Sequence, residues 1–479
     1  MIHQAAMRIS MSHVSFTPHA CAMPNFSSVP RVRPMPYSKK LSRSLWAKGT
    51  LATLLMTATF TYATAAEVEL LHWWTSDSET KAVQSLRTQL ATQGLVLKTP
   101  PLNGRAEALN QTLHERIAAG RAPDAVQMKA ADLPAWGDEN ALASLNAVAK
   151  EDKWDYKIPP QIAELVKYKG TYVAVPVNIH RVNWLYINRS LLAQVQGRAP
   201  QSWNQFFQLA ERLQKAGITP LAQGNQPWQN LTLFETVVLG VGGAEFYRSS
   251  LVRAEPASIE SPTMARAMQT FVALRPLTVP AKASNPGAGS GAAPSQDWNA
   301  ATAQVIEGKA AMQIMGDWAK GEFLTAHKVP NEDFLCVSTP GAANSYDYQV
   351  DSLAIFRKGK SPEPTPQQVA LTRAVISPGF QSTFNVAKGS IPINSSVDMS
   401  PFDACAKESS AFFLASRLAK TLVPSVAHRM ALDGPSHKIL ETRVDRLWND
   451  PTYSPAQAQR EWAAERRTPS VASAKPPKK

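Results

Sequence analysis

The chain has 479 residues, of which 44% are hydrophobic and 8% aromatic, and its formal net charge is +13. These values fit a globular chain long enough for two or more domains. Residues 1–66 hold seven Lys or Arg and residues 466–479 hold five, in both cases without an acidic residue, so the body between them carries about +1. A nearly neutral body argues against a phosphate-binding face, and no nucleic-acid partner is expected.

Residues 1–65 are predicted to be a leader that ends in a secretory signal peptide. A basic segment at 39–48 precedes a short apolar run at 51–62, which is too short and too rich in Thr to span a membrane well. Small residues at 63–65 form a cleavage signal, with the cut just after Ala65. The residue directly after the cut is Ala66 and not a cysteine, so we expect a soluble, exported protein without a lipid anchor.

The mature chain begins with a predicted strand at 68–71 that ends at two adjacent tryptophans, Trp73 and Trp74. Glu79 follows at the start of a predicted helix, 79–93. Ligands of open α/β sheets bind outside the carboxyl ends of the strands. Flat aromatic faces beside a carboxylate suit a sugar ring, whereas the alternative is that both tryptophans only pack in the core.

The first hundred residues after the predicted cut alternate strand and helix, which predicts a mostly parallel sheet covered on both faces. The predicted strands lie at 95–98, 124–128, 171–177, 184–188, 219–222, 310–315 and 351–356. Predicted helices cover 105–119, a segment capped by Asp132, a segment from Ser202 to Gly217, and a segment capped by Asp297. The chain is expected to cross to a second α/β unit at 175–178. Residues 281–295 are predicted to be a flexible insertion, and the tail after about Glu465 to be disordered.

Further candidate binding residues follow other predicted strands. Lys129 lies just after one strand, Trp318 after another, and Trp228 opens the segment after a third. Their common position at strand ends favours one binding cleft. Asp351 heads an apolar run, and a buried carboxylate there needs a partner such as a sugar hydroxyl or Lys388. Asn178 and His180 are interpreted as structural residues of the crossing.

Two cysteines remain after removal of the leader, which holds Cys21. Cys336 and Cys405 are predicted to form a disulfide in an oxidising compartment, the alternative being two separate buried thiols. The histidines show no metal-ligand spacing, so neither a metal nor a cofactor is expected.

Several segments of the mature chain resemble the periplasmic glucose-binding proteins of ABC sugar transporters, which are similar to maltose-binding proteins. The matching segments are His-Trp-Trp-Thr (72–75), Ala-Val-Pro-Val-Asn-Ile-His-Arg-Val-Asn-Trp (174–184), Gln-Pro-Trp-Gln (226–229), Gln-Ile-Met-Gly-Asp-Trp-Ala-Lys-Gly (313–321), Phe-Asn-Val-Ala-Lys-Gly-Ser-Ile-Pro (384–392) and Leu-Val-Pro-Ser-Val-Ala-His (422–428). The resemblance spans Glu67 to about Trp448. It implies a two-lobed type II periplasmic binding protein of class α/β, with one monosaccharide, D-glucose, held in the cleft between hinged lobes.

The resemblance also implies lobe boundaries, contacts and partners. Lobe 1 is expected at 66–177 and 349–394, and lobe 2 at 178–348 and 395–465. The implied sugar contacts are Trp73, Trp74, Glu79, Lys129, Asp351, Lys388 and His428, with Trp228 and Trp318 completing the aromatic walls. The implied partner is an inner-membrane ABC permease, and a monomer is expected. Arg429 departs from the pattern, because the family has a smaller residue after the histidine.

Two other functions remain open at this stage. An exported glycoside hydrolase would use Glu79 and Asp351 as its acid and nucleophile. A binding protein that feeds a chemosensor would share the sugar site and differ only in its partner. The candidate polar residues include as many cations as carboxylates, which favours binding over catalysis.

Overall fold

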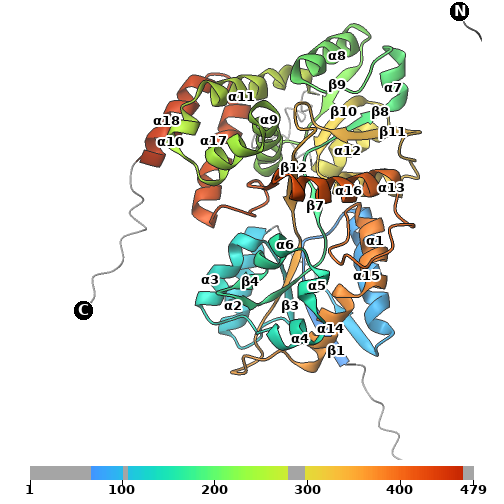
Figure 1. Ribbon diagram of the computed structural model, residues 1–479, viewed down its shortest axis with the longest axis vertical. Helices are drawn as coiled ribbons and strands as arrows, with labels where there is room; N and C mark the ends of the chain where they lie inside the picture. The colour runs from blue at the N-terminus through green and yellow to red at the C-terminus, as the bar shows by residue number, and fades with distance from the viewer. Residues whose placement is uncertain (1–65, 101–105, 279–296, 468–479) are drawn as a thin grey trace, which may run out of the picture. The chain divides into compact units, whose positions relative to one another are not determined.

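A computed structural model of the chain describes residues 66–100, 106–278 and 297–467. The predicted signal peptide, the insertion at 281–295 and residues 468–479 lie outside these ranges. The described residues belong to one unit, Ala63–Lys479. Within that unit two large sheets, each with its own helices, are joined through a small third sheet (Figure 1).

The first sheet has five strands in the order β2-β1-β3-β13-β6. Their bounds are β1 (Ala66–Leu71), β2 (Leu95–Lys98), β3 (Ala125–Met128), β6 (Ala174–Pro176) and β13 (Ser352–Ile355). β1 runs parallel to β2 and β3, and β13 runs antiparallel to β3 and β6. The segment predicted at 351–356 therefore returns to the first sheet and places Asp351 at its edge.

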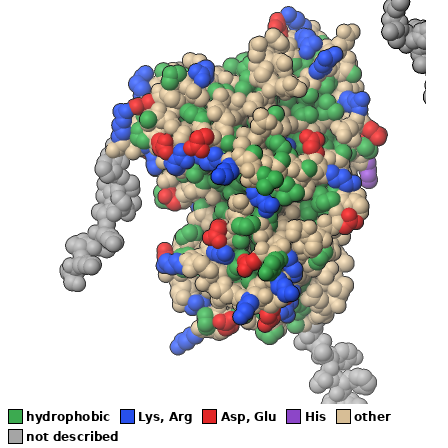
Figure 2. All heavy atoms as spheres, viewed as in Figure 1, with side chains coloured by type: hydrophobic (Ala, Val, Ile, Leu, Met, Phe, Trp, Pro, Cys, Tyr) green, Lys and Arg blue, Asp and Glu red, His purple; other side chains and the backbone are tan. Residues whose placement is uncertain are grey.

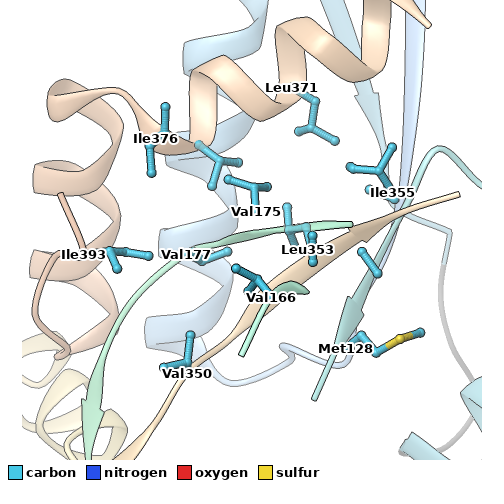
Figure 3. Packing of buried hydrophobic residues seen from close by; sticks show 14 of the residues in the cluster. Met128, Val166, Val175, Val177, Val350, Leu353, Ile355, Leu371, Ile376 and Ile393 are labelled. Atoms are coloured by element: carbon cyan, nitrogen blue, oxygen red, sulfur yellow. The ribbon is translucent and has the colours of Figure 1, made fainter. Parts of the chain in front are cut away.

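Continuous apolar strands form the core around the first sheet. Every residue of β3, β6 and β13 is buried, as expected for strands covered on both faces. Figure 3 shows Val175 of β6 and Leu353 of β13 packed side by side, with Leu371 of the adjoining helix above them. This packing gives the strand ends a rigid base.

In the described residues nine helical segments and a two-stranded hairpin surround this sheet, and a tenth segment, the last helix named below, packs against the small third sheet. Their bounds are α1 (Asp77–Ala91), α2 (Ala106–Ala118), η1 (Ala130–Asp132), α3 (Leu133–Asp138), α4 (Asn146–Glu151), α5 (Trp154–Lys157), α6 (Pro160–Glu164), α14 (Pro366–Ile376), α15 (Pro378–Lys388) and α16 (Ala404–Leu418), with the hairpin of β4 (Lys167–Tyr168) and β5 (Thr171–Tyr172). The helix predicted at 79–93 begins two residues earlier, because Ser76 caps it. The single strand predicted at 171–177 is divided into β5 and β6.

The second sheet has four strands in the order β11-β8-β10-β9. Their bounds are β8 (Trp184–Asn188), β9 (Thr219–Ala222), β10 (Ala310–Met315) and β11 (Phe334–Ser338). β10 is parallel to β9 but antiparallel to β8, which is also antiparallel to β11. The second sheet is therefore mixed, because β8 enters directly from the crossing in the opposite direction.

The helices around the second sheet include four that adjoin the cavity described below: α9, α12, α13 and α17. The bounds are α7 (Arg189–Gln194), α8 (Trp203–Lys215), α9 (Pro227–Tyr247), η2 (Arg248–Val252), α10 (Pro256–Ile259), α11 (Pro262–Ala273), η3 (Arg275–Leu277), α12 (Trp298–Ile306), α13 (Trp318–Thr325), α17 (Gly434–Asn449) and α18 (Pro455–Arg467). Ser202 caps α8 and Asp297 caps α12, as predicted. Helix α18 extends to Arg467, so the predicted disordered tail begins too early.

A small sheet in the order β14-β12-β7 lies between the two large sheets. It consists of β7 (His180–Arg181), β12 (Tyr346–Gln349) and β14 (Leu422–Pro424). The chain passes from β6 to β7 and from β12 to β13, and Ile179 bridges to Ile391 beside them. The predicted lobe boundary at 177/178 falls between β6 and β7, and the one at 348/349 falls within β12. The boundaries remain predictions.

The disulfide prediction is confirmed. Cys336 of β11 is bonded to Cys405 of α16, with their Cα atoms 6.2 Å apart. Both residues are buried in the same hydrophobic cluster as Trp184 and Phe323. The bond ties α16 to the second sheet.

Replacing both cysteines with alanine should lower the free energy of unfolding by about 4 kcal/mol, since the bond closes a loop of 69 positions in the unfolded chain. Urea denaturation of the two proteins measures the difference. Thiol titration of denatured, unreduced protein that lacks residues 1–65 is the control and should find no free thiol. Equal stability of the two proteins would contradict the prediction.

Acidic and basic side chains are interspersed over the face shown in Figure 2, as the near-neutral body predicts. Among the described helices, none is both long enough and apolar enough to cross a membrane.

Candidate functional site

A cavity of about 270 Å³ opens where the carboxyl end of the first sheet meets α13 and the segment after β14. All nine predicted sugar contacts line it: Trp73, Trp74, Glu79, Lys129, Trp228, Trp318, Asp351, Lys388 and His428. These residues come from seven separate parts of the sequence, so the fold brings the predicted set together.

The turn between β1 and α1 forms the first wall of the cavity. Ser76 caps α1 by accepting a hydrogen bond from the backbone N–H of Glu79, and Glu79 completes a capping box. Trp74 is only 4% exposed and meets Phe384 edge to face, so most of this side chain belongs to the core. Trp73 is more open, and its backbone N–H donates to Gln127. Trp73 therefore fits a stacking platform better than Trp74 does.

Glu79 forms a buried ion pair with Lys388, whose Nζ lies 2.8 Å from Glu79 Oε1. The backbone N–H groups of Thr75 and Ser76 donate to the other carboxylate oxygen. Burial by itself raises the pKa of the Glu79 carboxyl, but Lys388 and these N–H groups bring it below its usual value. Three of roughly four acceptor positions are thus filled, and one remains for a ligand.

Lys388 is held at this place by the end of α15. The next residue, Gly389, has φ +86°, and a Cβ there would lie 2.3 Å from the backbone oxygen of Asp317. Only glycine combines this conformation with such a close approach. Lys388 was one of two possible partners suggested for Asp351, and its hydrogen bond goes instead to Glu79.

Asp351 is the centre of a hydrogen-bond network. Its Oδ1 accepts from Lys129 Nζ at 3.1 Å, and also from the side-chain amides of Gln127 and Gln349. Its Oδ2 lies 3.3 Å from Asn178 Nδ2 and 3.2 Å from His180 Nε2. These contacts fill its acceptor positions with protein groups.

The network keeps the Asp351 carboxyl ionised. The side chain is almost fully buried, and burial alone raises its pKa. Lys129 and His180 outweigh that effect and hold the pKa of Asp351 well below its usual value. Asp351 thus fixes the ammonium group of Lys129, which also lies 5.4 Å from the centre of the Trp73 ring.

The second wall is aromatic. Trp318, Trp228 and His428 form a cluster, with the ring of His428 4.9 Å from Trp318 and 5.7 Å from Trp228. Trp228 lies in the first turn of α9, and Trp318 begins α13. The two rings are tilted by 50° to each other, which leaves an angled apolar face rather than a stacked pair.

His428 is neutral at physiological pH, because burial and then the charge of Lys129 lower its pKa well below its usual value. Its Nε2 lies 3.3 Å from Thr232 Oγ1, whose own hydrogen goes to the backbone oxygen of Trp228. His428 Nε2 must therefore carry the hydrogen in this contact, which leaves Nδ1 as an acceptor. Glu235 supports the loop from below by accepting from Ser425 Oγ and the backbone N–H groups of Val426 and Ala427.

Two sets of contacts join the first and second walls of the cavity. Ser78, at the start of α1, donates from its backbone N–H and its hydroxyl to Glu322 of α13. Arg429 forms an ion pair with Asp132, and its backbone oxygen accepts from Ala131 N–H at 3.1 Å. Arg429, which departs from the resemblance, thus holds the loop of His428 against the segment after Lys129.

Sequence reasoning missed several residues that line the cavity. His180 was assigned to the crossing alone, yet it lines the cavity and meets the Trp318 ring edge to face at 5.2 Å. Its Nδ1 is hydrogen-bonded to Asp317. The other missed lining residues are Thr75, Asp297, Trp298, Gln349, Ala427, Arg429, His437 and Glu441. Only Trp298 and Gln349 had a local signal, an aromatic and an amide at a strand or helix end.

Within the described ranges, no group of three or more His, Cys, Asp or Glu side chains could hold a metal ion. The chemistry of the cavity is instead that of ion pairs, amides and aromatic rings.

Comparison with known proteins is consistent with this geometry. Residues 104–370 match the family model of bacterial extracellular solute-binding proteins. A probable sugar-binding periplasmic protein of Brucella melitensis is 38% identical over 410 residues, which cover 85% of this chain and 94% of that protein. Another of the same description from Rhizobium meliloti is 38% identical over 401 residues, covering 83% of this chain and 93% of that protein.

Solved structures of sugar-binding proteins have the same fold as this chain. A solved chitin oligosaccharide binding protein superposes with a TM-score of 0.68 at 17% identity, covering 84% of this chain and 98% of that one. The two-lobed α/β architecture of solute receptors similar to maltose-binding protein is therefore confirmed. The chain belongs to the bacterial extracellular solute-binding protein family.

Proposed function

We propose that this protein is a periplasmic receptor that binds one monosaccharide, D-glucose, and delivers it to an ABC importer in the inner membrane. The cavity carries the proposal, because it joins an aromatic face to two buried lysine–carboxylate pairs. Aromatic rings stack on the C–H faces of a sugar, and charged groups bind its hydroxyls through strong hydrogen bonds.

The size of the cavity supports a single sugar ring. Its volume of about 270 Å³ lies just below the range of about 300–1,000 Å³ typical of sites for drug-sized ligands. Glucose carries its ring hydroxyls equatorially, so both faces of the ring are available to Trp73 and to the cluster of Trp228 and Trp318. The resemblance of the site segments to glucose-binding proteins supports the same choice.

The same site does not suit glycoside hydrolysis. That reaction needs one carboxyl with a raised pKa to protonate the leaving oxygen. The pKa values of Glu79 and Asp351 are both lowered, and both carboxylates are bound to ammonium groups. We therefore assign binding, not catalysis, to this pair.

The proposed partner and compartment rest on the relatives. Both compared proteins are described as periplasmic and sugar-binding, and the chain covers more than nine-tenths of each. The signal peptide predicted at 39–65 would deliver the chain to the same compartment. A monomer fits a receptor that presents its own cleft to a permease.

A thermal-shift screen over D-glucose, D-galactose, D-xylose and maltose tests the proposal. A ligand at 100 times its Kd should add about 2.7 kcal/mol to the free energy of unfolding, and glucose should give the largest shift. A larger shift with another sugar would overturn the choice of glucose, and no shift with any of them would overturn the sugar site. Incubation with aryl glucosides is the control for hydrolysis and should release no aglycone.

A further inference from the structure

Glu235 of α9 is a fully buried carboxylate next to the loop that follows β14. Its Oε1 accepts a hydrogen bond from Ser425 Oγ at 2.6 Å. Its Oε2 accepts from the Tyr247 hydroxyl at 2.7 Å, and from the backbone N–H groups of Val426 and Ala427 at 2.8 and 3.0 Å. Four donors therefore converge on one carboxylate, and three of them belong to the loop.

This loop, residues 425–428, connects the carboxylate to the sugar cavity. Ala427 and His428 both line the cavity. Ser425 Oγ, which donates to Glu235, also accepts from the backbone N–H of His428 at 3.1 Å. An ionised carboxylate can only accept, so the hydroxyl hydrogen of Ser425 faces Glu235 and a lone pair is left for His428. Two successive hydrogen bonds thus link Glu235 to the backbone of a site residue.

The loop and a proton compete for the carboxylate of Glu235. Burial raises the pKa of this carboxyl to about 7, although the four hydrogen bonds that it accepts lower the pKa. A carboxylate has about four acceptor positions, so an added proton takes one that a donor already fills and weakens the other bonds. Ionisation of Glu235 and order in the loop therefore favour each other.

Asp347 of β12 is a second buried carboxyl close to Glu235. It is 0% exposed, and neither of its carboxyl oxygens has a hydrogen-bond partner among the described residues. Burial and then the charge of Glu235 raise the pKa of Asp347 well above its usual value. Asp347 is therefore neutral when Glu235 is ionised, and Glu235 is the member of this pair that titrates near pH 7.

Other ionisable groups lie on the elements that pack around this carboxylate. They are Tyr247 of α9, Arg248 of η2, Tyr348 of β12, His428 of the loop, and His437, Glu441 and Asp445 of α17. Tyr247 is hydrogen-bonded to Glu235, and burial keeps it protonated by raising its pKa. His437 Nε2 is hydrogen-bonded to the backbone oxygen of Ala427. An experiment on pH must therefore separate Glu235 from the two histidines.

We propose that Glu235 is a positioning residue of the sugar site, which holds residues 425–428 in the binding conformation when it is ionised and releases them when it is protonated. The inference rests on the proposed function and adds control of sugar binding by pH. Glu235 acts through Ser425 and the backbone of His428, without contact to the sugar. Because linkage is reciprocal, acid should weaken sugar binding and sugar binding should expel a proton.

Calorimetry of the wild-type protein with D-glucose at pH 6 and pH 8 is the first part of the test. Affinity should be about fivefold or more lower at pH 6, which is the lower end of measured couplings between linked sites. Titrations near pH 7 in two buffers of different ionisation enthalpy should show that protons are released on binding. Melting curves of the ligand-free protein at both pH values check that it remains folded.

Two variants assign the effect to a residue. Glu235→Gln has the shape of the protonated carboxyl and does not titrate. It should bind glucose at pH 8 as weakly as the wild type does at pH 6, and its affinity should change by less than about twofold between the two pH values. Asp347→Asn is the matched control, because it keeps a neutral side chain beside Glu235. Its dependence on pH should be that of the wild type.

Equal wild-type affinity at pH 6 and pH 8, or binding without proton release, would overturn the inference and leave the proposed function standing. The full dependence on pH in Glu235→Gln would overturn it in favour of the histidines, and its loss in Asp347→Asn would assign the titration to Asp347. If Glu235→Gln does not fold, proton release by the wild type and by Asp347→Asn decides. No binding of glucose at either pH would overturn the proposed function as well.

Discussion

Replacing Asp351 with alanine is expected to weaken glucose binding by at least about a hundredfold, equivalent to about 2.7 kcal/mol. The carboxylate holds Lys129 in place and accepts from four further side chains. Its removal releases the ammonium group and leaves buried donors unpaired. Each hydrogen bond to a charged group is worth about 1.5–3 kcal/mol, so loss of the bond from the displaced Lys129 ammonium group to the sugar, together with the unpaired donors, accounts for the effect.

Calorimetry and urea denaturation of the same preparations separate binding from stability. The free energy of unfolding should also fall, because the buried network loses the carboxylate that its donors share. Asp351→Asn should lower it less, since asparagine keeps the volume. Folding lowers the pKa of Asp351, so the stability contributed by its ionised form is present above the unfolded pKa and is lost as the pH falls toward the folded pKa. The difference in the free energy of unfolding between the wild type and Asp351→Asn should therefore shrink in acid.

Asp77→Asn, at an exposed position of α1, is the control. Near-normal glucose affinity of Asp351→Ala would remove Asp351 from the site.

The strands of the second sheet show which elements the local sequence pattern can predict. The ranges predicted at 184–188, 219–222 and 310–315 coincide with β8, β9 and β10, because each is a short apolar run with clear boundaries. The run at 171–177 was predicted as one strand, but Val173 N–H donates to the backbone oxygen of Val166, between β5, which pairs with β4, and β6, which pairs with β13. That contact is not visible in the local sequence.

The site shows the same limit. The rule that ligands bind at strand ends was enough to gather Trp73, Lys129 and Trp318 into one cavity. It did not identify partners: Lys388 pairs with Glu79, 309 positions away in the sequence, and not with Asp351.

Replacing Glu79 with glutamine should lower the free energy of unfolding by about 3–5 kcal/mol, because it leaves the ammonium group of Lys388 buried without its counter-ion. Lys388 is 3% exposed, so water cannot replace the carboxylate. Glutamine keeps an acceptor for the backbone N–H groups of Thr75 and Ser76, and the cap of α1 is preserved. The loss therefore measures the ion pair and not the helix end.

The double variant Glu79→Gln with Lys388→Met should recover most of that stability but none of the affinity for glucose. Methionine removes the unpaired ammonium charge of Lys388 and keeps an unbranched side chain of similar length. Buried ion pairs can often be replaced by apolar groups with little loss of stability. The sugar, however, loses the ammonium donors of Lys388 and the remaining acceptor of Glu79. Affinity in both variants should fall by at least about tenfold, the value of one charged hydrogen bond.

The exposed pair Glu211–Lys215 of α8 provides the matched control, since its side chains are 64% and 73% exposed at the same kind of Nζ–carboxylate contact. Glu211→Gln should change the free energy of unfolding by no more than about 0.5 kcal/mol and leave glucose affinity unchanged. Urea denaturation and calorimetry of the four proteins give both quantities. Recovery of affinity together with stability in the double variant would show that Glu79 and Lys388 only support the fold. Binding would then need well-packed side chains at these two positions of the cavity wall, but not their charges. Recovery of stability alone is the result expected of a pair that holds the wall in place and also binds the ligand.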